Sequence, residues 1–192
     1  MRRVLAACLA VFSIAATAAP PHALHKALPK PPLKPAIDQL FAQLAQAQSP
    51  EDAKPIEDRI AALFEQSGSA SVDLLMARGS AALAAGDEET AKKLFDTVTY
   101  LAPRYAEGWH QKAQLEVEGG NDEAAMISLQ KTITLNPRHF EALSQLGDML
   151  EEYGRKDGAL QMYKRALALD PQLEGAAKHA HELEKAVEGQ GI

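Results

Sequence analysis

Side chains able to bind a metal ion are few in this chain of 192 residues. The single cysteine, Cys8, lies near the N-terminus, and six histidines are distributed along the rest. His179 and His181 are two apart, so on a helix they diverge and cannot share a metal ion. His22 and His25 lie among prolines, which lack the backbone N–H that copper capture by a chain terminus requires. The sequence therefore predicts no metal site and no cofactor.

Residues arranged for catalysis are equally hard to find. The sequence contains no glycine-rich phosphate loop, no nucleophile elbow and no pair of histidines at metal-binding spacing. His110 stands alone beside Trp109, which is typical of a packed or surface histidine. We therefore predict that the protein is not an enzyme.

The first 18 residues have the pattern of a secretory signal peptide. A basic start, Met1–Arg3, precedes an apolar run at 4–19, and small residues indicate cleavage after Ala18. The run is short and alanine-rich beside the ~20 strongly apolar residues of a membrane helix. Residues 5–8 match a lipobox, but too few apolar residues precede Cys8 for lipoprotein anchoring to be favoured. We expect a periplasmic or secreted protein without an integral membrane segment after cleavage.

The charge of the chain is acidic, with 20 basic and 26 acidic residues. Loss of Arg2 and Arg3 with the leader takes the basic residues to 18 and the net charge from −6 to −8. Nucleic acid and anionic membrane are therefore disfavoured as partners. Residues 19–35 hold six of the eleven prolines and predict an extended, Pro-rich linker.

Two apolar series at helical spacing predict a helical hairpin at 36–71. The series are Ile37, Leu40, Phe41, Leu44 and then Ile56, Ile60, Leu63, Phe64. Between them, Ser49 followed by Pro50 has the pattern of an N-cap and a first helical residue. Pro55 is expected to kink the second helix or delay its start.

The remainder of the chain is organised by a repeat. Pro103, Pro137 and Pro171 follow one another at intervals of 34 residues, and the same small, apolar and turn residues precede each. Aligned on these prolines, the units are 72–105, 106–139 and 140–173. Two-helix repeats of this length bury their apolar faces by stacking on their neighbours.

The units resemble tetratricopeptide repeats (TPRs). In the third unit the matching positions are Leu143, Leu146, Gly147, Leu150, Ala159, Tyr163, Ala166 and Pro171. In the second they are Trp109, Ala113, Ala125, Leu129 and Pro137, and in the first Leu75, Gly79, Ala82, Ala91, Phe95 and Pro103. The predicted fold class is all-α: a right-handed α-solenoid of three TPR units, with an N-terminal hairpin covering one end and a capping helix and tail at 174–192 covering the other.

Each recurring position has a physical role. Small residues such as Gly79 and Gly147 allow the two helices of a unit to approach, and large ones such as Phe95 fill the space between. Turns with glycine reverse the chain. Lys112 and Glu116 depart from the pattern, and their spacing leaves two interpretations open: a solvated pair on one helix face, or a polar pocket between the first and second units.

The resemblance implies a concave groove lined by the first helix of each unit. The implied groove residues are Asp73, Met76, Ser80, Leu83, Glu107, His110, Gln114, Val117, Glu118, Glu141, Ser144, Asp148, Glu151 and Glu152. This set is acidic, and it lacks the basic and asparagine residues with which some members of the family hold a carboxyl terminus.

The expected function is that of a bacterial, non-catalytic adaptor or scaffold. Its partner is expected to be a basic or amphipathic segment of an envelope protein, drawn by the acids and contacting Met76, Leu83 and Val117. Two alternatives remain: the acids serve only for solubility, or the repeats self-associate into an envelope scaffold.

Overall fold

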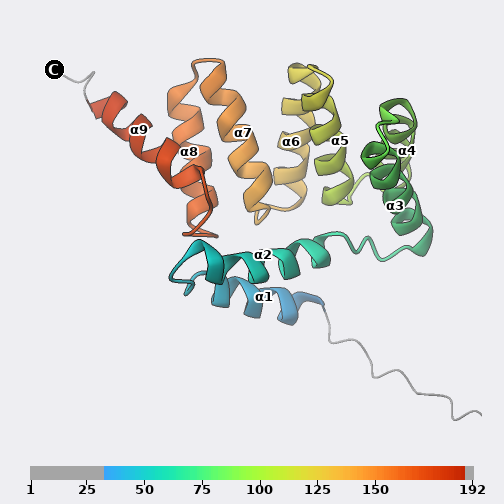
Figure 1. The fold of residues 1–192 in the computed structure, drawn as a ribbon, viewed down its shortest axis with the longest axis horizontal. Helices are drawn as coiled ribbons and strands as arrows, with labels where there is room; N and C mark the ends of the chain where they lie inside the picture. Colours follow the sequence, from blue (N-terminus) through green and yellow to red (C-terminus); the bar gives the residue numbers. More distant parts are fainter. Residues whose placement is uncertain (1–32, 189–192) are drawn as a thin grey trace, which may run out of the picture. The chain divides into compact units, whose positions relative to one another are not determined.

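The computed structural model describes residues 33–188, with side-chain detail for 36–186, and this range consists of helices and turns without a strand (Figure 1). The helices are α1 Leu33–Leu44, α2 Pro50–Phe64, α3 Ala70–Ala84, α4 Glu88–Leu101, α5 Ala106–Glu118, α6 Asp122–Leu135, α7 Phe140–Glu152, α8 Lys156–Leu167 and α9 Ala176–Glu188. The predicted all-α fold class is confirmed. The predicted signal peptide and most of the Pro-rich linker lie outside the described residues.

The three units are helical hairpins, α3/α4, α5/α6 and α7/α8, and consecutive hairpins pack through α4 on α5 and α6 on α7. Within each unit the chain turns at a glycine of positive φ: Gly86 (76°), Gly120 (68°) and Gly154 (70°). Asp87 and Asn121 then cap the second helix, accepting from the Thr90 and Ala124 N–H groups at 3.1 and 3.4 Å. The turns therefore lie where the sequence places them.

The helices of a unit approach closely because of the small residues in the pattern. A Cβ atom at Gly79 would lie 2.5 Å from the Phe95 ring, and one at Gly147 would lie 2.7 Å from the Tyr163 ring. Phe95, Leu129 and Tyr163 are fully buried. The predicted small-against-large packing is confirmed.

Helix α9 covers the exposed side of α8. Ala176, Ala180 and Leu183 pack against Ala159 and Tyr163, and charged residues such as Lys178 and Glu182 face solvent. This is the arrangement expected of a solenoid cap, whose outer face must be polar.

The N-terminal hairpin α1/α2 differs most from expectation. Helix α1 begins at Leu33, earlier than the boundary at 36, because Pro35 falls in the first turn, where no intrahelical N–H is needed. Helix α2 begins at Pro50 with Ser49 as N-cap, accepting from the Asp52 N–H at 3.2 Å. Pro55 lies within the helix and does not delay its start.

The sequence suggested that the hairpin covers the N-terminal end of the repeats. That prediction is wrong. The apolar face of the hairpin packs on Phe140, Leu169 and Leu173, which lie at the start of α7 and in the α8–α9 turn. At the other end of α2, the Glu65 carbonyl accepts from the Tyr105 hydroxyl, in the α4–α5 turn, at 2.7 Å. The hairpin thus runs along the turns that join successive units (Figure 1). No helix in the described range is both long and apolar enough to span a membrane.

Candidate functional site

The implied groove residues all lie on α3, α5 and α7, the first helices of the three units. Two hollows form along these helices. The α3 hollow, of about 440 Å³, is lined by Ala62, Glu65, Gln66, Asp73, Met76, Ala77, Ser80 and Gln111. The α5–α7 hollow, of about 230 Å³, is lined by Gln114, Val117, Gln145, Asp148, Met149 and Glu152. The groove is therefore divided, and α2 supplies one wall of its first part.

The α5–α7 hollow combines an apolar floor with acidic walls. Met149 is 7% exposed and Val117 46% exposed, and together they offer the apolar surface. Asp148 and Glu152 lie four residues apart on α7, so both project from one face of that helix. Such a surface suits a long cationic side chain, whose methylene stem packs on the floor while its charge reaches the carboxylates.

Not every implied residue is available in the groove. Glu107 and His110 are 6% and 2% exposed, and Leu83 packs into the core of the first unit. Glu151 Oε2 lies 2.9 Å from His179 Nδ1. The hydroxyl of buried Tyr163 lies 2.7 Å from Asp148 Oδ1 and 3.1 Å from Glu151 Oε2, so one oxygen of Asp148 also has a partner within the protein. Ser144 and Glu141 are half-buried and Glu118 is exposed, outside both hollows.

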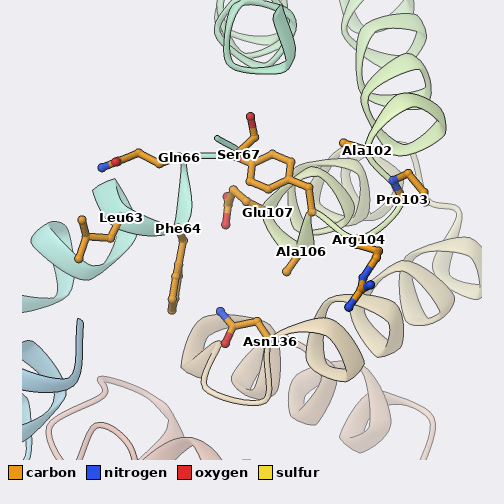
Figure 2. A pocket seen from close by; sticks show the side chains of 11 residues that line it. Leu63, Phe64, Gln66, Ser67, Ala102, Pro103, Arg104, Ala106, Glu107 and Asn136 are labelled. Atoms are coloured by element: carbon orange, nitrogen blue, oxygen red, sulfur yellow. The ribbon is translucent and has the colours of Figure 1, made fainter. Parts of the chain in front are cut away.

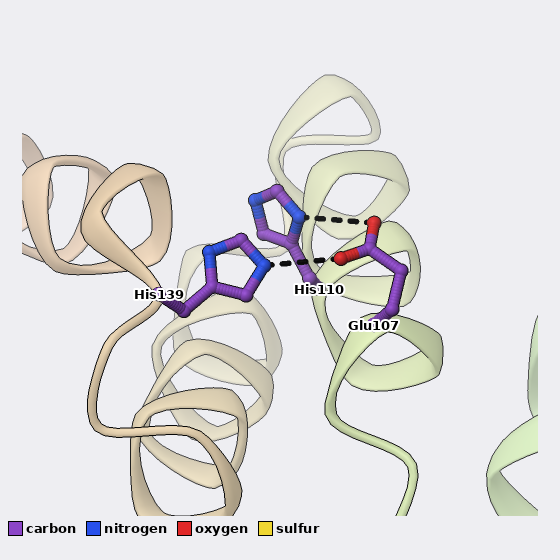
Figure 3. A group of neighbouring side chains, drawn as sticks. All are labelled: Glu107, His110 and His139. Carbon is purple, nitrogen blue, oxygen red and sulfur yellow. Dashed lines mark hydrogen bonds and ion pairs between the residues drawn. The ribbon is translucent and has the colours of Figure 1, made fainter. Parts of the chain in front are cut away.

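The carboxylate of buried Glu107 faces two histidines, whose ring centroids lie 4.2 Å apart (Figure 3). His110 Nδ1 lies 3.4 Å from Glu107 Oε1, and His139 Nε2 lies 3.0 Å from Oε2. The Gln111 amide also donates to Oε1 at 2.8 Å. The prediction that His110 stands alone is therefore wrong. Spacing of three on one helix gave a signal for Glu107 and His110, but His139 comes from the next turn and no sequence pattern joined it to them.

Hydrogen bonds orient the two histidine rings of this cluster. The Ala142 N–H donates to His139 Nδ1 at 3.3 Å, so the proton of a neutral His139 is on Nε2 and points to Glu107. His110 lies between Glu107 and the Gln145 Oε1 atom, which is 3.1 Å from its Nε2 atom, so a protonated His110 ring donates to both. Where the His110 ring is protonated, it forms a buried ion pair with Glu107 beside a neutral His139.

The pKa directions agree with these charges. Burial alone would raise the pKa of Glu107, but the bonds from His110 and His139 outweigh it and hold that pKa well below its usual range. Burial would lower the pKa of His110, yet the bond and the charge of Glu107 raise it. For His139 burial prevails, assisted by the charge of His110, and its pKa is lowered.

The three side chains also place ligand atoms within 4.8 Å of one another, the arrangement of a zinc site. Ligation through His139 Nε2 would move its proton to Nδ1, which then could not accept from Ala142. A metal ion would thus remove the side-chain cap of α7. The donor set fits a charge pair better than a metal centre.

A cavity of about 500 Å³ adjoins this cluster, between the end of α2 and the α4–α5 turn (Figure 2). Leu63, Phe64 and Pro103 give it apolar walls, and Glu107 lines it as well. Both Glu107 oxygens already accept hydrogen bonds. The cavity is a loosely packed part of the contact between hairpin and repeats, and Arg104 and Asn136 also line it.

Lys112 and Glu116, which differ from the repeat pattern, form polar contacts between the first and second units. Lys112 Nζ lies 2.5 Å from Asp96 Oδ1, on α4, and 3.9 Å from Glu116 Oε1. The Ser128 hydroxyl donates to Glu116 at 2.6 Å. A pocket of about 420 Å³ opens beside them, between α4 and α5. Lys112 therefore pairs across the unit boundary more closely than along its own helix.

Comparison with known proteins bears on the repeats. Residues 106–139 and 140–173 each match a family model described as Tetratricopeptide repeat. A TPR repeat-containing protein of Rhizobium etli is 35% identical over 85 residues, or 44% of this chain and 42% of that protein. The chain therefore spans less than half the length of this curated relative.

Solved structures share the fold. The first TPR of Spaghetti (RPAP3), bound to the HSP90 peptide SRMEEVD, is 17% identical with a TM-score of 0.56, covering 61% of this chain and 95% of that one. MamA is 18% identical with a TM-score of 0.56, covering 74% and 86%. A mutant O-GlcNAc transferase of Thermobaculum terrenum is 24% identical with a TM-score of 0.53, covering 59% and 22%. The chain thus carries tetratricopeptide repeats, and its described helices have the α-solenoid fold of such proteins.

Proposed function

We propose that the protein is a non-catalytic adaptor whose groove binds a basic or amphipathic segment of an envelope protein in the bacterial periplasm. The observation that carries this proposal is the α5–α7 hollow, where Asp148 and Glu152 stand over Val117 and Met149. The first TPR of RPAP3 is bound to a peptide of another protein. That peptide ends in acidic residues, whereas the groove here is acidic, so a partner of opposite charge is favoured.

The non-catalytic part of the proposal is supported by His110. Its ring is 2% exposed and both nitrogens are hydrogen-bonded, so a substrate could not reach it. The periplasmic part depends on the leader pattern at 1–18. Detection of the chain in a periplasmic extract, with its N-terminus at Ala19, tests the location.

Charge reversal tests the groove. Crosslinking in an envelope extract identifies the partner, and anisotropy titration with its labelled segment gives the affinity. We expect Asp148→Lys combined with Glu152→Lys to weaken binding at least tenfold, because two attractive charges become repulsive. Adding Glu118→Lys should weaken it slightly more.

The matched control is Glu123→Lys, which reverses an exposed charge on the second helix α6. It should leave the affinity within about twofold of the unchanged protein. The affinity should also fall as salt rises, since exposed charges are screened. Acidic partners alone, or an affinity independent of salt, would refute the proposal.

A further inference from the structure

The first repeat unit has an exposed face at the end of the row of hairpins farthest from α9 (Figure 1). The third unit packs on the second through four buried or partly buried residues: Ala142, Leu146, Met149 and Leu169. Two repeat periods earlier, the equivalent positions hold Leu74, Arg78, Ala81 and Leu101, here called the α3 end face. All four are exposed, Leu74 to 52% and Leu101 to 57%. The first unit therefore exposes the surface that later units use for stacking.

The two ends of the stack differ in what covers them. Helix α9 packs on α8 and turns charged residues such as Lys178 and Glu182 to solvent. The hairpin α1/α2 lies along the unit turns instead and leaves Leu74 and Leu101 exposed. Terminal faces of a solenoid need a polar cover, and an exposed apolar face marks a site of interaction. The α3 end face is therefore an interaction surface that no helix of the described range covers.

The repeat itself indicates which charge belongs opposite Arg78. Lys112 holds the equivalent position one period later, and its Nζ atom lies 2.5 Å from Asp96 Oδ1 on α4, the helix stacked on α5. Arg78 is exposed and has no ion pair among residues 36–186. A helix stacked on α3 as α4 is stacked on α5 would place a carboxylate beside Arg78, where a charge-assisted hydrogen bond can form.

Side-chain size defines the rest of the partner helix. On α5, Gly108 occupies the position of Leu74, and a Cβ atom there would lie 2.7 Å from Val98 Cγ1 of α4. A helix over Leu74 therefore needs a side chain smaller than valine at that point. Ala81 stands where α5 has buried Leu115, so it leaves room for a large apolar side chain. The face thus fits a helix with a large apolar, an acidic and a small residue along one side.

From these equivalences we infer that the α3 end face binds a helix of another protein, stacked as α4 is on α5, with an acidic residue paired to Arg78. A second copy of this chain fits less well, because two such faces bring two arginines together and contain no acid. The outer side of α9 is polar and does not match the face either. The face shares no residue with the lining of the α3 hollow. The inference therefore does not depend on the proposed groove.

A labelled synthetic peptide based on α4 tests the surface by anisotropy titration with the full mature chain. The peptide has the sequence of residues 87–103 with two changes, Lys92→Leu and Val98→Ala. The first change frees Asp96 from its 2.9 Å ion pair with Lys92 and supplies the large apolar side chain. The second change supplies the small one. We expect saturable binding that weakens at least about tenfold in Arg78→Glu, because an attraction becomes a repulsion.

Reversed charges assign the contact to one pair of residues. A peptide that also carries Asp96→Lys should bind the Arg78→Glu chain within about threefold of the original affinity, since the ion pair is restored with opposite signs. The matched control is Arg59→Glu, which reverses an exposed arginine on α2. It should change the affinity less than about twofold, because its charge lies outside the face and is screened.

Several outcomes would overturn the inference. Two of them are the absence of saturable binding to the unchanged chain and binding that Arg78→Glu leaves unaltered. Another is a dimer in light scattering that becomes a monomer in Leu74→Ser, which would assign the face to a second copy. Asp148→Lys combined with Glu152→Lys should leave peptide binding unchanged. Loss of binding in that variant would place the peptide in the groove, so this test separates the failure of one proposal from the failure of the other.

Discussion

The interior of the repeats and the contact between repeats and hairpin differ in the interactions that hold them together. Within the repeats, small residues such as Gly147 face large buried rings such as Tyr163. At the hairpin, the Arg138–Asp38 ion pair and a partly filled cavity adjoin an apolar cluster that includes Phe41 and Phe140. Close packing holds the first region together, while the second combines apolar packing with an ion pair and unfilled space.

Glu107 lies where the two regions meet, because Phe64 of α2 stacks on His139 at a centroid distance of 4.9 Å. Glu107→Gln should have the largest effect, lowering the free energy of unfolding by about 2–4 kcal/mol near pH 5.5, since it removes one partner of a buried pair. Urea unfolding of both proteins measures it. A loss below about 1 kcal/mol would contradict a buried charge pair.

The pH dependence of that difference follows from the two shifts. Because its pKa is lowered by folding, Glu107 stabilises the fold above its unfolded pKa of about 4.5, and this stabilisation is lost as pH falls. Because its pKa is raised by folding, His110 stabilises the fold below its unfolded pKa of about 6.5, and this stabilisation is lost as pH rises. The difference in free energy of unfolding between the unchanged protein and Glu107→Gln should therefore be largest between pH 4.5 and pH 6.5, and smaller below and above that range.

In the interior, Gly147→Ala should cost about 1–3 kcal/mol, because its Cβ would lie 2.7 Å from the Tyr163 ring. Gly158→Ala is the matched control on α8, where the added Cβ meets Leu150 at an ordinary 3.4 Å. That substitution should be neutral or stabilise by about 0.5–1 kcal/mol, through loss of backbone freedom in the unfolded chain. Thermal or urea unfolding distinguishes them, and equal losses would mean that the close approach is not limiting.

The two regions also differ in how far sequence alone could predict them. The period of 34 located the unit helices, their caps and the buried residues, because each contact recurs in every unit. The hairpin was predicted as a helix pair, but its position was not, because Phe41 and Phe140 are distant in sequence and follow no common period. The same holds for the site: the groove helices were predicted, whereas the pairing of His139 with Glu107 depends on how two turns meet.

Arg138 offers the smallest test of the comparison. Its guanidinium lies 3.8 Å from the centre of the Phe41 ring and pairs with Asp38, which is half exposed. Arg138→Gln should lower the free energy of global unfolding by less than about 1 kcal/mol, since exposed ion pairs contribute little. It should nevertheless lower the hydrogen-exchange protection of the backbone amides at 37–64. Asp38→Asn, which removes the ion pair but keeps the stacked guanidinium, should lower protection less. If Arg138→Gln instead destabilised repeats and hairpin equally, the two regions would form one cooperative unit, and the hairpin could not detach from the repeats alone.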